Sequence, residues 1–103
     1  MAEALVKIST EGGVWVRQLH FVRQGDVHVG HLHSHDHVTL LAHGRLRVRV
    51  ETQVQDFTAP HIIVIAKQKR HDLEALDADT VAYCVASLAN VATPEIRLKG
   101  SPP

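Results

Sequence analysis

The chain has little of what marks several large classes of protein. Its 103 residues include one cysteine, Cys84, which excludes an internal disulfide and is typical of a reducing compartment. No apolar run approaches the roughly 20 residues that a membrane-spanning helix needs. The first residues, 1–7, lack the long apolar core of a signal peptide. We therefore expect a cytoplasmic protein with no membrane partner.

An excess of charge of either sign is also missing. Lysine plus arginine and aspartate plus glutamate each number 11, so the formal net charge is zero when histidine is neutral. This balance argues against a nucleic-acid partner, because such surfaces are built to neutralise phosphates. The chain is 45% hydrophobic, enough for one core at this length. We expect one domain over residues 1–103, with its core at about 14–88 and a loose tail at 90–103.

Short segments with the two-residue period of a β-strand recur along the chain, and no convincing helical stretch occurs. Residues 45–51 alternate strictly, with Arg45, Arg47 and Arg49 in the row expected to face solvent. Residues 61–65 form a continuous apolar run, which predicts burial on both faces. An all-β fold of short antiparallel strands, a sandwich or barrel, is expected. The predicted strands are 5–8, 14–21, 37–41, 45–51, 53–57, 61–65, 71–76 and 80–88.

What the chain has in abundance is histidine, and six of its nine histidines fall between residues 25 and 44. His31 and His33 are two positions apart, so on a strand both side chains project from one face. The polar segment 34–36 favours a chain reversal. His37 would then begin a neighbouring strand beside the first. Three imidazoles would meet at one point, which predicts a metal site.

The spacing around these histidines resembles the first motif of the cupins, small jelly-roll barrels that hold a metal in the mouth. That motif has a glycine, five residues, His-x-His, three or four residues, a glutamate, six residues and a second glycine. Here Gly25, His31, His33 and Gly44 keep the spacing, and His37 replaces the glutamate. The second motif contributes one histidine from a later strand, and His71 stands at its place. Two departures from that second motif are Ala66-Lys67-Gln68 in place of Pro-x-Gly, and Ala75 in place of asparagine.

The resemblance implies a single-domain cupin-like jelly-roll barrel of the four-histidine type. His31, His33, His37 and His71 would bind one divalent ion: manganese, iron, nickel, copper or zinc. Such a site is expected to act on a small oxygenated molecule, by dioxygenation, oxidative cleavage or isomerisation. A metal-binding or ligand-binding module without turnover, and a metal-stabilised structural subunit, remain as alternatives. The resemblance also implies a homodimer, with residues 5–8 and 14–21 as the expected interface.

Two further residues are candidates for a catalytic role. Tyr83 on the last core strand has a phenol that could donate a proton beside the metal, or simply fill the barrel. His35 lies in the predicted turn between ligands, where it is expected to be solvent-exposed or to contact substrate. Three of the remaining histidines, His28, His43 and His61, are expected in turns or at the surface. His20, on an earlier strand, could reach the mouth. Cys84 is expected to be a small core residue, and Trp15 and Phe21 core or dimer contacts.

Overall fold

The computed structural model describes residues 2–30, 37–65 and 70–87, with His37 described only in its backbone. These ranges contain nine β-strands and no helix. No helix that could span a membrane occurs among them. The strands are β1 (Leu5–Glu11), β2 (Val14–Phe21), β3 (Val27–Val29), β4 (His37–His43), β5 (Arg45–Val50), β6 (Gln53–Thr58), β7 (His61–Ile65), β8 (His71–Ala75) and β9 (Thr80–Ser87).

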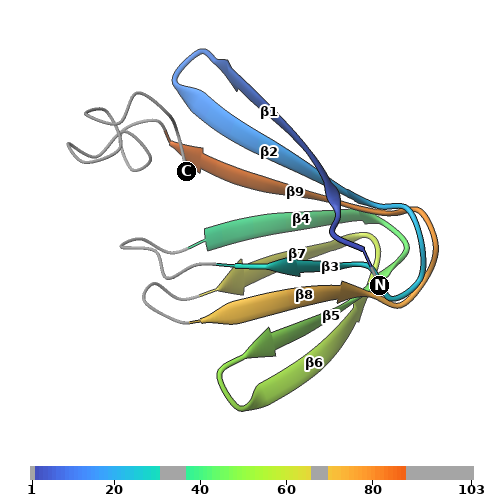
Figure 1. The fold of residues 1–103 in the computed structure, drawn as a ribbon. Coiled ribbons are helices and arrows are strands. Elements are labelled where there is room, and N and C mark those ends of the chain that lie inside the picture. Colours follow the sequence, from blue (N-terminus) through green and yellow to red (C-terminus); the bar gives the residue numbers. More distant parts are fainter. Residues whose placement is uncertain (1, 31–36, 66–69, 88–103) are drawn as a thin grey trace.

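The strands form two antiparallel sheets that enclose one core. The five-stranded sheet has the order β1-β2-β9-β4-β7, and the four-stranded sheet has the order β3-β8-β5-β6. Figure 1 shows the two sheets facing each other and converging at one end, where the connections cross between them. At the other end, β3 and β7 finish while β4 and β8 begin. We call this second end the mouth of the barrel. The predicted all-β antiparallel barrel is confirmed.

The two-residue period decides which side chains enter the core. On β2 the residues Trp15, Arg17, Leu19 and Phe21 are buried, whereas those between them are half-buried or exposed. Trp15 and Phe21 are therefore core residues. The other buried apolar side chains come from both sheets and fill the space between them. They are Ala4, Leu41, Leu46, Val48, Ile63, Ile65, Leu73, Ala75, Ala82 and Cys84.

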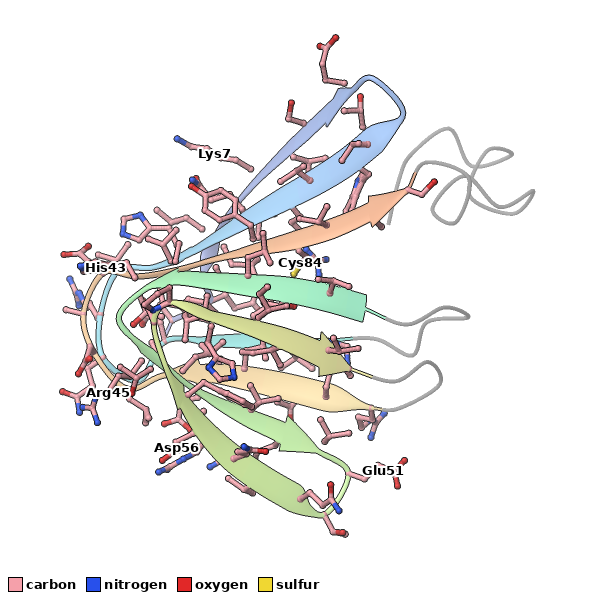
Figure 2. All side chains as sticks on the ribbon, turned by 180° about the vertical axis from the view of Figure 1, so that it is seen from behind. Lys7, His43, Arg45, Glu51, Asp56 and Cys84 are labelled. Carbon is pink, nitrogen blue, oxygen red and sulfur yellow. The ribbon has the colours of Figure 1, made fainter. Side chains whose placement is uncertain are left out.

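The outer surface of the four-stranded sheet is charged, as the alternation of residues 45–51 predicted. Arg45 and Arg47 each donate two hydrogen bonds to a carboxylate, from Asp77 and Asp56 respectively, at 2.8–3.0 Å. Arg49 pairs with Glu74 at 3.0 Å. Figure 2 shows Arg45 and Asp56 pointing outward, while Cys84 lies among the strands. Arginine donation holds the pKa of Asp77 and of Asp56 below its usual range.

Two details of the strands differ from the sequence prediction. Strand β7 is buried on one face only, because Ile62 and Val64 are 68% and 64% exposed. It forms the edge of its sheet, and none of the described residues covers its outer face. Strand β4 continues to His43, where a turn had been expected, and the chain reverses at Gly44 with φ at +85°. Gly44 also packs against Thr80, so a β-carbon there would overlap the threonine side chain.

Several predictions concern residues outside the described ranges. These are the strand face carrying His31 and His33, the reversal at 34–36 and the C-terminal tail.

Candidate functional site

His71 is the first residue of β8 and lies at the mouth of the barrel (Figure 1). It belongs to the inward row of that strand with Leu73 and Ala75, and it is only 2% exposed. Burying an imidazole among apolar side chains costs free energy unless its nitrogen atoms form hydrogen bonds or bind a metal. The position predicted as the fourth ligand is therefore an interior position at the open end.

Gly30 is the close neighbour of this imidazole. Its backbone N–H donates a hydrogen bond of 2.9 Å to the carbonyl oxygen of His71, which extends the β3–β8 pairing. A β-carbon at position 30 would overlap three atoms of the His71 ring, Nε2, Cδ2 and Cε1. Only glycine gives the ring this space. The backbone of residue 30 thus forms one wall of the His71 position.

The opposite sheet places residue 37 at the same end of the barrel. Strand β4 begins at His37, whose backbone pairs with Ile65 at the end of β7. Position 37 belongs to the alternating row that continues with the buried Thr39 and Leu41. The structure therefore brings positions 37 and 71 to the mouth from two different sheets, as Figure 1 shows for β4 and β8.

The other predicted ligands, His31 and His33, and the predicted assisting residue, His35, lie outside the described residues. Their backbone connects β3 to β4, so they belong to the segment between Gly30 and position 37. Among the residues that the structure does describe, no group of three or more metal-binding side chains occurs. Of the four predicted ligands, the structure therefore describes His71 in full and His37 by its backbone position only.

A cavity of about 300 Å³ opens between the free edges of the two sheets. Its walls include Val50, the strand neighbour of His71, and Ile65, the strand neighbour of position 37. The cavity is therefore bordered by neighbours of both positions and has the size of a small-molecule site. Its lining residues are Val48, Val50, Gln53, Gln55, Phe57, Ile63, Val64 and Ile65.

A row of polar side chains crosses the inner face of the five-stranded sheet, and sequence reasoning missed it. Arg17 on β2, Cys84 on β9 and Thr39 on β4 lie opposite one another in the strand register. The Arg17 Nη2 donates to the Cys84 Sγ at 3.7 Å, and the Thr39 Oγ1 lies 3.6 Å from the same sulfur. The available signal was the position of Arg17, two residues from Trp15 and two from Leu19 in the apolar row of its strand.

Tyr83 does not share the interior with these residues, which corrects the prediction for it. The buried row of β9 consists of Thr80, Ala82 and Cys84, so Tyr83 faces the outside of the sheet. Its phenol oxygen accepts a hydrogen bond of 2.9 Å from the Gln18 amide, on the outer face of β2. The predictions for Tyr83 and Cys84 placed both side chains inside the barrel, although neighbouring residues of a strand face opposite sides, and only the row of Cys84 is buried. Cys84 is a buried core residue, as predicted.

The remaining described histidines are spread over the barrel. His43 is exposed, and His20 lies on the outer row of β2, where its Nε2 is 2.9 Å from an Asp79 carboxylate oxygen. His61 is exposed and its ring lies 4.8 Å from that of Phe57. His28 departs from the expected surface position. It is half-buried on β3 and lies opposite Leu73, in the row that faces the interior.

Solved structures of low sequence identity share this fold. A cupin 2 domain-containing protein from Halorhodospira halophila matches with a TM-score of 0.71 and 19% identity, over 82% of this chain and 64% of that chain. KdgF from a Halomonas species matches with a TM-score of 0.67 and 19% identity, over 80% and 77%. An RmlC-like cupin with a double-stranded β-helix fold from Methanocaldococcus jannaschii matches with a TM-score of 0.70 and 11% identity, over 84% and 82%.

No family model matches the chain, and no curated protein is similar to it. The chain spans just under two thirds of the length of the Halorhodospira protein. The fold is nevertheless defined: the two sheets form the double-stranded β-helix of the cupins. The barrel is therefore a cupin fold whose mouth carries a buried histidine, His71.

Proposed function

We propose that the protein binds one divalent metal ion at the mouth of the barrel through His31, His33, His37 and His71, and that it acts there on a small oxygenated molecule. The observation that carries the proposal is the setting of His71. A buried imidazole stands at the open end of a cupin barrel, and a glycine backbone leaves room for its ring. The described residues are compatible with a metal ion there, because position 37 begins a strand of the facing sheet at the same end of the barrel as His71.

Neutral imidazole binds manganese, iron, nickel, copper and zinc, so the ligand set alone leaves the metal open. A divalent ion held by four histidines would retain its full charge and would polarise an oxygen of the bound molecule. The roles of the chain are to position the ligands and to exclude water. The apolar cavity beside Val50 and Ile65 would receive the carbon skeleton of a small substrate. The reaction class proposed is an oxygenation, an oxidative cleavage or an isomerisation.

Two variants test whether turnover depends on the bound metal. The metal-loaded protein is expected to convert members of a panel of small oxo and hydroxy compounds, and His33→Ala is expected to abolish both bound metal and turnover. His61→Ala is the matched control, since that histidine is exposed and its ring lies tilted beside that of Phe57. A fully active metal-free preparation would end the proposal. Binding without any product would favour the alternative of a ligand-binding module.

The structural alternative predicts a different result. If the metal serves only to stabilise the barrel, binding energy becomes folding energy and removal of the metal lowers the melting temperature. The test is the melting temperature with and without chelator, measured alongside turnover. A large shift with no turnover on any compound would favour a metal-stabilised subunit.

We also propose that the protein is a homodimer that works in the cytoplasm, a compartment consistent with the free thiol of Cys84. Strand β1 is an edge strand, and every residue in it is exposed. Its apolar residues Leu5, Val6 and Ile8 are 47–58% exposed, which favours pairing with a second copy. Light scattering is expected to give twice the chain mass. Ile8→Lys should return the protein to a monomer, and a wild-type monomer would contradict the proposal.

A further inference from the structure

Arg17 is a cation in the interior of the barrel. The side chain is only 7% exposed, although arginine stays charged at every physiological pH. Within the described part of the chain, none of the ion pairs includes Arg17. Its contacts there are the weak hydrogen bond from Nη2 to the Cys84 thiol and a stacking contact on the Trp15 ring, 5.4 Å from the ring centre. Neither contact compensates the charge.

Two buried N–H donors at this place find no acceptor among the described residues. They are the Nε of Arg17 and the indole Nε1 of Trp15. Both groups can only donate, so what they require is an acceptor, and beside a guanidinium an anionic one is favoured. The three outward arginines of β5 behave differently, since each is paired with an aspartate or a glutamate. Carboxylates thus pair with the three outward arginines of β5, and none of the described carboxylates pairs with Arg17.

We propose that Arg17 and Trp15 form a binding subsite for the carboxylate group of a small organic acid. A carboxylate matches the planar edge of a guanidinium, on which Nε and a neighbouring Nη donate side by side. The indole N–H adds a donor, and the ring covers the cation.

The register places this subsite just below the mouth. Arg17 lies in the same row as Cys84 and Thr39, and Thr39 is two residues along β4 from position 37. Two residues along β4 correspond to about 7 Å, and β9 separates β2 from β4, which adds about 10 Å across the sheet. Provided that the proposed metal function holds, a short acid could be anchored by Arg17 while its second oxygen function reaches the mouth. The substrate class is then a small oxo or hydroxy acid.

The test uses the fluorescence of Trp15, the single tryptophan of the chain, as a direct reporter of the subsite. Chelator-treated full-length protein is titrated with glycolate and with its neutral isostere glycolamide, at constant ionic strength. Saturable binding of glycolate, with little response to glycolamide, is expected. Arg17→Gln and Arg17→Met should weaken glycolate binding about tenfold or more, because a charge-assisted pair of hydrogen bonds is lost. Arg47→Gln, which removes an outward arginine, should bind like the wild type.

The results separate the subsite from the metal proposal. Equal affinity for glycolate and glycolamide, or full affinity in both Arg17 variants, overturns the subsite even if metal binds. If glycolate binding depends on Arg17 but is not strengthened by added metal, that result supports the subsite and counts against binding of the acid to the metal. The melting temperature of each variant confirms that it is folded. Should both variants fail to fold, the glycolate–glycolamide comparison on wild-type protein still decides.

Discussion

Substitution of Gly30 by alanine tests how the barrel holds His71. The added methyl group would overlap the Nε2, Cδ2 and Cε1 atoms of the imidazole. The ring has little room to retreat, since the residue is 2% exposed and sits at the start of a paired strand. Overpacking of a filled interior costs about 1–3 kcal/mol. In a chain of this size each kcal/mol lowers the melting temperature by about 4–8 °C, so a fall of about 4–24 °C is expected.

A double-mutant cycle isolates the responsible contact. In a His71→Ala background the obstacle is absent and Gly30 has no positive φ, so Gly30→Ala should change the free energy of unfolding by less than about 1 kcal/mol there. The free energy of unfolding of all four proteins is measured in urea, without metal. A coupling of about 1–2 kcal/mol between the two positions supports the contact. Equal costs of Gly30→Ala in both backgrounds would refute the reasoning, because the glycine would then serve some purpose other than making room for the ring.

Further predictions concern acid stability and the core. Backbone donation to Asp26 from Arg23, and arginine donation to Asp56 and Asp77, lower the pKa of these carboxyls. Their contribution to stability is therefore present above the ordinary pKa of 3.8 and is lost as the pH falls through the lower pKa values of the folded state. The free energy of unfolding in urea, measured from pH 6 to 2, should therefore fall less steeply with acid in a variant with Asp26, Asp56 and Asp77 all changed to Asn. Phe21→Ala removes a fully buried ring and should lower the free energy of unfolding in urea by about 3–5 kcal/mol. Ile62→Ala changes a side chain that is 68% exposed and should cost under about 1 kcal/mol. Similar costs for the two variants would contradict the assignment of the inner face.

Much of the fold could be predicted because the strands are half-buried and their alternation shows in the sequence. Residues 14–21 and 61–65 form strands with the predicted bounds, and the arginine row of 45–49 faces outward. What alternation cannot give is which of two rows points inward when both contain apolar residues. On β9 both Tyr83 and Cys84 were expected inside the barrel, whereas the structure buries only the row of Cys84.

Less of the candidate site than of the fold could be predicted from the sequence. The position of His71 came from the resemblance to a family motif, since its distance along the chain from the other histidines gives no geometric warrant. The roles of Gly30 and Arg17 could not be predicted from the sequence, for two different reasons. The role of Gly30 depends on a contact with a strand about 40 residues away. Arg17 is a charged residue in an apolar row, and polar residues in such rows are usually assigned to solvent.

The metal content of the purified protein tests the central claim most directly. Protein prepared without chelator or affinity metal is analysed for divalent metals, beside His71→Ala and the control His61→Ala. The account predicts close to one ion per chain in the wild type and in His61→Ala, and a large loss in His71→Ala. A wild-type chain that carries no metal and takes up none when manganese, iron, nickel, copper or zinc is supplied would contradict it.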